Sequence, residues 1–355
     1  MQILQRAFIV LFCAFFTFTH SQAQTVPEQI DALFTEYDSK LVPGASVLVS
    51  KDGHVIFEKS YGLQDVENKV ASHPQTNYRL ASLSKAFTAM AIVILVEQGK
   101  LSYDSKLGDL IAGFPAYAKN ITVRHLLNHQ AGMIDYEGII PDSTSEQLLD
   151  ADVVALLQKQ PNTYFVPGSA YRYSNGGYAT LAHIVATVSG ETFESFLEEN
   201  IFTPLAMDNT IAFVNGVNDI KHRAFGYTAT GNSFQRTDQS LTSAVLGDGG
   251  VYSSLRDLAK WDAALYGNDV VTDESLKLIF TPATLNNGQK TEYGFGWVMD
   301  TYKGYERISH TGSTIGFRHS IVRFPKEKIC IIILVNRASA APWTKANSIS
   351  DIVLK

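Results

Sequence analysis

A serine and a lysine three residues apart, Ser82 and Lys85, stand at the start of a long apolar segment. Almost nothing polar follows from Ala86 to Val96, which predicts a buried helix with Ser82 in its first turn. Residues three apart share a helix face, so the Lys85 amine can reach the Ser82 hydroxyl. A neutral, desolvated lysine can take the proton that makes a serine nucleophilic. The alternative is a helix N-terminus with a surface lysine, because a motif this short also occurs by accident.

A second group of polar residues lies in the aromatic segment 171–178, where Tyr173 and Asn175 flank a serine. Two glycines and a predicted helix, Ala179–Val188, follow. A tyrosine held near Lys85 can exchange protons with it, and an asparagine amide can hold a substrate carbonyl. The alternative is an ordinary loop that caps the next helix.

The third group is His310, Thr311, Gly312 and Ser313, between two predicted strands. A glycine there lets a substrate backbone approach closely, and the Ser313 N–H could supply half of an oxyanion hole. The alternative is a hairpin connection with a solvated histidine.

Composition limits the class of protein. The chain has 355 residues, 45% hydrophobic and 18% charged, enough to bury a large core. A formal charge of −6 without a basic cluster argues against nucleic acid as a partner. Cys330 lies in an apolar run, which predicts a buried strand position and no reactive thiol.

The N-terminus has the pattern of a secretory signal. Arg6 precedes an apolar stretch from Ala7 to Phe18, and a small-x-small motif ends at Ala23. This predicts a signal peptide over residues 1–23, cleaved after Ala23. About 12 apolar residues are too few to span a bilayer. We therefore expect a periplasmic or secreted protein with no stable membrane span after cleavage.

Strand patterns lie at both ends of the chain, with helical patterns between them. The expected strands are Ala45–Val49, His54–Phe57, Tyr293–Val298, Glu306–Ser309, Phe317–Phe324 and Ile329–Val335. Terminal helices are expected at Glu28–Leu41 and Ala341–Val353, with short proline-broken helices between about 101 and 282.

This order predicts one sheet built from distant parts of the chain, with the helical block as an insertion packed against it. Residues 24–355 would form a single catalytic unit. Its sheet lobe would take about 24–100 and 286–355, and its helical lobe about 101–285.

Taken together, Ser-x-x-Lys, Tyr-Ser-Asn and His-Thr-Gly, in that order, resemble motifs of the penicillin-recognising serine enzymes. The Tyr-x-Asn form is most similar to class C β-lactamases and related D-alanyl-D-alanine carboxypeptidases, D-aminopeptidases and esterases. Further similar segments are Gly44–Val47, Leu126–His129, Ile201–Leu205 and Gly249–Ser253. The resemblance implies an α/β (α+β), β-lactamase/transpeptidase-like fold, an antiparallel sheet flanked by helices with a large, mostly helical insertion.

The resemblance also implies roles for the residues. Ser82 would be the acylated nucleophile and Lys85 its general base. Tyr173 would relay the proton to the leaving group and activate the deacylating water, while Asn175 would bind the acyl side chain. The N–H groups of Ser82 and Ser313 would form the oxyanion hole, where one donor contributes ~2.7–4 kcal/mol.

His310, Thr311 and Gly312 would contact the substrate. Typical class C β-lactamases have a lysine at the position of His310, and its permanent charge holds a substrate carboxylate. A free histidine, with a pKa of ~6.5, is mostly neutral at pH 7. We therefore expect no efficient β-lactam hydrolysis, although penicillins could still acylate Ser82.

The expected function is that of an exported serine hydrolase that forms an acyl-enzyme on amide or ester bonds, of D-amino-acid peptide, carboxypeptidase or esterase type. Small molecules or short peptides, such as cell-wall fragments or β-lactams, are the expected partners. A class C-like β-lactamase and a penicillin-binding or sensor module without turnover are the alternatives. The sequence does not predict the oligomeric state.

No metal or organic cofactor is expected. His125 and His129 have the spacing of two zinc ligands, but the glutamate that a zinc protease needs does not follow His125. Loops 136–144 and 215–240 are predicted to edge the cleft and to set specificity.

Overall fold

The computed structural model describes residues 24–355, so the predicted signal peptide lies outside the described residues. Among residues 24–355, no helix is both long and apolar enough to cross a bilayer.

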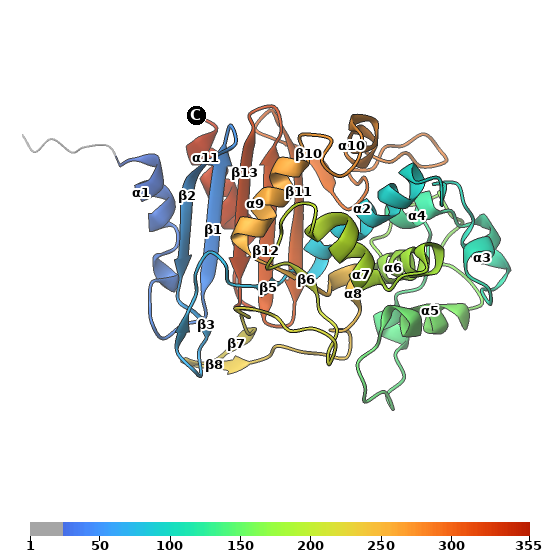
Figure 1. The fold of residues 1–355 in the computed structure, drawn as a ribbon, viewed down its shortest axis with the longest axis horizontal. Coiled ribbons are helices and arrows are strands. Elements are labelled where there is room, and N and C mark those ends of the chain that lie inside the picture. Colours follow the sequence, from blue (N-terminus) through green and yellow to red (C-terminus); the bar gives the residue numbers. More distant parts are fainter. Residues whose placement is uncertain (1–23) are drawn as a thin grey trace, which may run out of the picture.

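A six-stranded antiparallel sheet forms one side of the molecule (Figure 1), in the order β10-β11-β12-β13-β1-β2. The strands are β1 (Ala45–Lys51), β2 (His54–Tyr61), β10 (Val298–Tyr302), β11 (Tyr305–Thr314), β12 (Phe317–Phe324) and β13 (Ile329–Val335). The first pairs with the last, from Ala45 opposite Val335 to Lys51 opposite Ile329. The prediction of one sheet made from both ends of the chain is confirmed.

Strand β13 lies at the centre of the sheet because its side chains are apolar on both faces, and all seven residues are buried. Ile332 and Leu334 join the core that includes α2 (Ser84–Glu97). Ile331 and Ile333 join a second core with α1 (Val26–Ala32) and α11 (Pro342–Val353). Helices therefore cover both faces of the sheet.

The middle of the chain forms the helical block. Its helices are α3 (Leu107–Leu110), α4 (Val123–Leu127), α5 (Asp150–Gln158), α6 (Asn175–Ser189), α7 (Phe193–Leu197), α8 (Leu246–Gly249), α9 (Leu255–Ala264) and α10 (Asp273–Ile279). Short 3₁₀ or π turns are η1 (Thr35–Tyr37), η2 (Ala81–Leu83), η3 (Ala116–Asn120), η4 (Tyr136–Ile139) and η5 (Glu198–Phe202). Three small sheets are formed by β3 (Leu63–Asp65) with β4 (Val70–Ala71), β5 (Tyr78–Arg79) with β9 (Val251–Ser253) and β6 (Ile211–Ala212), and β7 (Tyr227–Thr230) with β8 (Ser233–Arg236).

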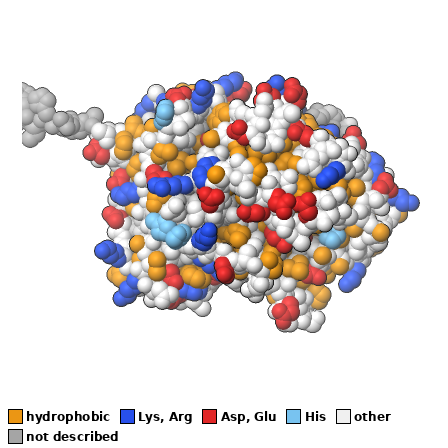
Figure 2. Space-filling view, viewed as in Figure 1, with side chains coloured by type: hydrophobic (Ala, Val, Ile, Leu, Met, Phe, Trp, Pro, Cys, Tyr) orange, Lys and Arg blue, Asp and Glu red, His pale blue; other side chains and the backbone are white. Residues whose placement is uncertain are grey.

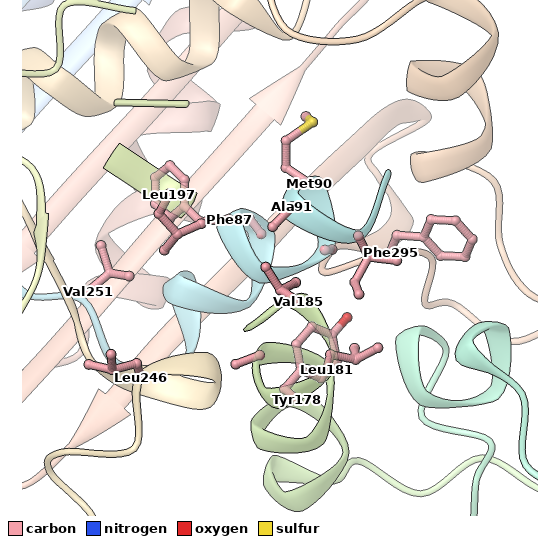
Figure 3. Close-up of a cluster of buried hydrophobic side chains, with 14 of the residues drawn as sticks. Phe87, Met90, Ala91, Tyr178, Leu181, Val185, Leu197, Leu246, Val251 and Phe295 are labelled. Carbon is pink, nitrogen blue, oxygen red and sulfur yellow. The ribbon is translucent and has the colours of Figure 1, made fainter. Parts of the chain in front are cut away.

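Helix α2 runs through the core, and every residue from Ser84 to Leu95 is buried, as the apolar sequence predicts. Its side chains pack against α6, where Ala91 lies near Val185 (Figure 3), while Phe87 contacts the rings of Phe202 and Trp261. Residues that carry chemistry on α2 and α6 are therefore fixed relative to one another by a packed interface.

Several predicted elements have other bounds in the structure, and two of them also differ in kind. The predicted strand Tyr293–Val298 is instead a tight turn that leads into β10, because Gly296 has φ +79° and Gly294 N donates to Trp297 O at 2.9 Å. The predicted helix Glu28–Leu41 is α1 followed by the separate turn η1, although Ile30 and Phe34 are buried as their spacing suggests.

The face shown in Figure 2 carries acidic side chains over α7. They edge a surface cleft that contains Glu194, Glu198, Glu199, Asp208 and Asp219. This cleft shares no residue with the cavities around Ser82.

Candidate active site

Ser82 lies in the turn η2, not in the first turn of α2 as predicted, since α2 begins at Ser84. The 3₁₀ turn runs directly into the helix, so the three-residue spacing still places both side chains on one face. The Lys85 Nζ atom lies 3.2 Å from the Ser82 Oγ atom.

The residue before the nucleophile has a strained backbone. Ala81 has φ +51°, a conformation that costs a residue with a Cβ about 1 kcal/mol or more. Neighbouring segments hold it there: Leu80 N donates to Val251 O at 2.8 Å, and His319 Nε2 lies 2.7 Å from Arg79 O. A strained turn that is held in this way fixes the direction of the next side chain, which is that of Ser82.

Lys85 is fully buried and faces three oxygen atoms. Besides Ser82 Oγ, these are Asn175 Oδ1 and Asp248 O, both 2.8 Å from Nζ. The last two can only accept hydrogen bonds. A neutral amine has two N–H groups and one lone pair, so it can satisfy both acceptors and turn its lone pair to the Ser82 hydroxyl.

The Tyr173–Asn175 segment is fixed at the start of α6. Ser174 is the N-cap, since its Oγ accepts from Gly177 N at 3.0 Å. Its own N–H donates to His129 Nδ1 at 3.1 Å. The helix begins at Asn175, earlier than the predicted Ala179, so Asn175 points from the first turn toward Lys85.

Tyr173 lies beside Lys85, with the Nζ atom 4.9 Å from the centre of its ring. The side chain is 36% exposed. Within residues 24–355 its hydroxyl makes no hydrogen bond, unlike the amine of Lys85. The phenol is therefore free to meet a substrate or a water molecule.

His310 lies inside β11, not in a hairpin connection, and is buried. Its Nε2 is 3.0 Å from the Tyr293 hydroxyl and its Nδ1 2.7 Å from Thr311 O. A proton on Nδ1 satisfies Thr311 O and leaves Nε2 to accept from Tyr293. Burial lowers the pKa of His310 to about 4, and Lys85 acts in the same direction when its amine is protonated. The imidazole is therefore neutral at pH 7.

Gly312 allows β11 to pass close to the nucleophile turn. A Cβ added at Gly312 would lie 2.3 Å from the backbone oxygen of Leu80, the residue before η2, so the glycine lets β11 approach the nucleophile turn. The sequence predicted a close approach of the substrate backbone at Gly312, which stays a prediction. Ser313 lies with Ser82 in the walls of both cavities, which brings the two predicted oxyanion-hole residues together.

Two cavities meet at Ser82. The narrow pocket, of about 110 Å³, is lined by Arg79, Tyr136, Glu137, Asn175 and Asp248 among others. The wide cleft, of about 440 Å³, is lined by Tyr171, Tyr173, Tyr293, His310 and Thr311 among others.

Several site residues were not predicted from the sequence. Glu137 lies in the predicted specificity loop 136–144, and its Oε1 accepts from Asn175 Nδ2 at 2.7 Å. Asp248 accepts from the Tyr136 hydroxyl at 2.9 Å. Neither has a motif of its own, although Asp248 adjoins the family-like segment at Gly249. No residue of 215–240 lines either cavity.

His125 and His129 do not share a helix face, since α4 ends at Leu127. His125 Nδ1 accepts from Thr122 N at 3.2 Å at the start of α4. His129 is buried, and burial together with Lys85 holds its pKa well below the usual value. It supports the Tyr173–Asn175 segment through Ser174.

Strand β11 of the antiparallel sheet passes a Ser–Lys pair at the start of a buried helix. This arrangement defines a class of protein, the serine hydrolases of β-lactamase/transpeptidase fold. Residues 30–350 match the family described as Beta-lactamase. The chain belongs to this family, and the predicted fold is confirmed.

Named relatives agree with this assignment. Penicillin-binding protein 4* of Bacillus subtilis (strain 168) is 31% identical over 91% of this chain and 74% of that protein. A D-aminopeptidase of Gluconobacter oxydans (strain 621H) is 25% identical over 86% of this chain, which spans only 58% of that protein. The solved octameric penicillin-binding protein homologue from Pyrococcus abyssi superposes with a TM-score of 0.78 at 27% identity, covering 92% of this chain and 76% of that one.

Proposed function

We propose that the protein is an exported serine hydrolase that acts through an acyl-enzyme on amide or ester bonds of D-amino-acid peptides or small esters. The observation that carries the proposal is the environment of Lys85. Its amine contacts Ser82 Oγ at 3.2 Å and two oxygens that can only accept. When the amine is neutral, its two N–H groups satisfy these two oxygens and its lone pair faces the nucleophile.

In the first step Ser82 Oγ attacks the substrate carbonyl carbon and its proton passes to Lys85 Nζ. The carbonyl oxygen becomes negative and is held by the N–H groups of Ser82 and Ser313. Tyr173 then delivers a proton to the leaving nitrogen or oxygen as its bond to the carbonyl carbon breaks. A water molecule then gives a proton to the Tyr173 phenolate and attacks the acyl carbon. The bond from that carbon to Ser82 Oγ breaks, Lys85 returns its proton to Ser82 Oγ, and the acid is released.

The alternative of a class C-like β-lactamase is less well supported. His310 stands where those enzymes have lysine, and its pKa of about 4 leaves it uncharged at neutral pH because it is buried. It offers no cation to the carboxylate of a β-lactam. A penicillin-binding or sensor module without turnover is disfavoured because it would not need all three of Ser82, Lys85 and Tyr173.

Two further parts of the proposal, export and the substrate class, rest on the N-terminal sequence and on similarity to named relatives. The pattern over residues 1–23 supports export to the periplasm or beyond. The names of the relatives, a penicillin-binding protein and a D-aminopeptidase, support substrates that contain D-residues, such as cell-wall fragments. The proposed mechanism uses no metal or organic cofactor.

A hydrolysis panel tests the proposal: a D-Ala-D-Ala peptide, a D-amino-acid anilide, a nitrophenyl ester and a chromogenic cephalosporin. We expect turnover of an amide or ester by the wild type and a loss of at least roughly 10³-fold in Ser82→Ala. Faster turnover of the cephalosporin than of every other compound would favour the β-lactamase. Full activity of Ser82→Ala would refute the assigned nucleophile.

A further inference from the structure

The wide cleft is the side of the site that takes the leaving group. Tyr173, the proton donor to the leaving group in the proposed mechanism, lines the wide cleft but not the narrow pocket. Within the described part of the chain, no Lys, Arg, Asp or Glu lines the wide cleft, and its histidine is the neutral His310. A carboxylate on the first leaving residue would therefore lose water there without gaining a cationic partner, which costs free energy.

The wide cleft continues into a second groove of about 610 Å³, which we call the distal groove. Tyr171, Tyr293 and Val298 line both of them. One wall of the distal groove is the segment 169–171, and the other is the loop 285–293. A leaving group that passes between the two tyrosines therefore enters a space large enough for several further residues.

The two walls are joined to each other at one end, so the distal groove is preformed. Asn286 N donates to Gly168 O at 2.8 Å, and Asn286 Nδ2 donates to Pro167 O at 3.1 Å. A Cβ added at Gly168 would lie 2.5 Å from Asn286 Oδ1, so the contact is close. The groove does not need a movement of either wall in order to form.

Loop 285–293 is one side of a hairpin that leads away from the wide cleft. Ala283 N donates to Tyr293 O at 2.9 Å at its base, and Leu285 N donates to Gln289 O at 2.8 Å near its tip. The segment from Tyr293 to Gln289 therefore runs from the wide cleft to the far end of the groove. Lys290 is three residues from Tyr293, a separation of roughly 10 Å in an extended chain.

The two charged residues of the distal groove lie at different distances from the wide cleft. Glu292 adjoins Tyr293 and lies near Tyr171. Burial raises the pKa of Tyr171 to about 12, and Tyr173 and Glu292 act in the same direction. Lys290 lies farther out. Among residues 24–355, neither Lys290 nor Glu292 has an oppositely charged side-chain atom within 4.0 Å, so both charges can meet a ligand.

We propose that the distal groove binds a leaving chain of two or three residues whose terminal carboxylate pairs with Lys290. The substrate class is then a peptide cleaved at an interior bond, and not a peptide that loses its last residue alone. Two extended residues span roughly 7 Å and three roughly 10 Å, so the carboxylate of the second or third residue can reach Lys290. The carboxylate of a single leaving residue would instead lie on the side of Glu292, which repels it.

This inference rests on the proposed function and specifies its substrate. Ser82 Oγ bonds to the acyl carbon, and the bond from that carbon to the nitrogen of the first leaving residue breaks. That nitrogen takes the proton of Tyr173, and the leaving chain departs through the distal groove as a free amine. Water then releases the acyl part as an acid.

The test compares the wild-type cleavage of N-acetyl-D-Ala-Gly, N-acetyl-D-Ala-Gly-Gly-Gly and the carboxamide of the longer peptide at pH 7. We expect kcat/KM for the longer acid to exceed that for the short one by about tenfold or more. The longer acid should exceed its own carboxamide by about three- to fivefold, the size of one exposed ion pair.

Lys290→Glu should abolish or reverse the preference for the longer acid over its carboxamide, because the charge at the end of the groove changes sign. Lys277→Glu is the matched control. Lys277 is an exposed lysine of α10 that lines neither the wide cleft nor the distal groove, so this variant should keep the wild-type ratio.

Equal or faster cleavage of N-acetyl-D-Ala-Gly, or an unchanged ratio in Lys290→Glu, would overturn the inference. Hydrolysis of p-nitrophenyl acetate, lost in Ser82→Ala, separates the two levels. If that ester is cleaved through Ser82 and the peptides are not, or show no preference for length, only the inference fails. If no substrate is cleaved through Ser82, the proposed function fails as well.

Discussion

Lys85 and Tyr173 differ in how firmly the protein holds their polar groups. This difference matches the two proton transfers that the mechanism needs. Lys85 is fully buried and its amine has three fixed oxygen neighbours. Tyr173 is partly exposed, and its hydroxyl has no hydrogen bond to any residue from 24 to 355. The fixed amine of Lys85 can take the proton of the nearby Ser82 hydroxyl. The hydroxyl of Tyr173 can reach leaving groups of different length and, later, a water molecule.

We predict that Tyr173→Phe lowers kcat by roughly 10²–10⁴-fold, the usual contribution of a general acid or base. The stability should change by less than about 0.5 kcal/mol, since the lost hydroxyl has no partner within the described chain. Steady-state kinetics and a urea unfolding curve measure both. A fall in stability with little change in kcat would mean that Tyr173 is structural.

Three elements far apart in the sequence bring the site together. The turn η2 leading into α2 carries Ser82, the first turn of α6 carries Asn175, and β11 carries Ser313. The contacts between them are made by backbone as well as by side chains. Because Gly312 lies against Leu80 O, the spacing between β11 and η2 depends on a residue without a Cβ.

Gly312→Ala should therefore separate β11 from η2. We expect a loss of about 1–3 kcal/mol in stability, as for other overpacked positions, and at least a roughly tenfold loss of activity. Gly267→Ala is the matched control, since its added Cβ would meet nothing nearer than 3.6 Å. Unfolding curves and ester hydrolysis measure the pair, and a fully active Gly312→Ala would show that this spacing does not matter.

At the scale of the whole molecule, the sheet joins the two ends of the chain. His319, on β12, connects the sheet to the segment that carries the nucleophile. Its Nε2 lies 2.7 Å from Arg79 O, three residues before the nucleophile, and its Nδ1 accepts from Val335 N at 3.3 Å. One proton, on Nε2, satisfies both contacts. Protonation of Nδ1 would break the second, and burial lowers the pKa of His319 to about 4.

This predicts a dependence of global stability on pH. Above pH ~6.5 the imidazole is neutral in both folded and unfolded chains, so it does not make the free energy of unfolding depend on pH. Below that value the unfolded chain binds a proton that the folded protein does not, until the folded pKa of about 4 is reached. The free energy of unfolding should thus fall by ~1.4 kcal/mol per pH unit from this group, in total ~3 kcal/mol.

His319→Gln should remove that part of the slope between pH 6.5 and 4.5, measured by urea unfolding at several pH values. The difference between the variant and the wild type isolates this group from others, such as Asp248, whose pKa burial raises to about 6 and which acts in the opposite direction. Identical slopes for the two proteins would contradict the assignment.

The sequence predicted those elements whose pattern is set by burial alone. Strands β12 and β13 have the predicted bounds because their apolar runs end at turns, and α2 is apolar on all sides because it is buried on all sides. The predicted strand at Tyr293–Val298 was wrong because its path depends on tertiary contact. A Cβ at Gly294 would lie 2.3 Å from Ile279 O, which no local pattern reveals.

The same distinction holds for the site. The predicted residues carry motifs, and the structure brings Ser82, Lys85, Tyr173 and Asn175 together. Glu137 and Asp248 lie on the short elements η4 and α8, whose sequences carry no recognisable motif, and only folding brings them to the site. Their places next to Asn175 and Lys85 could therefore not be predicted from the sequence.

The central claim is that the Ser82 hydroxyl becomes covalently acylated, and mass spectrometry of the intact protein tests it most directly. After brief exposure to a fluorescent penicillin or a D-amino-acid active ester, the wild type should gain the mass of one acyl group. Peptide mapping should place that group on Ser82, and Ser82→Ala should remain unlabelled. An adduct on another residue, or equal labelling of Ser82→Ala, would contradict the account.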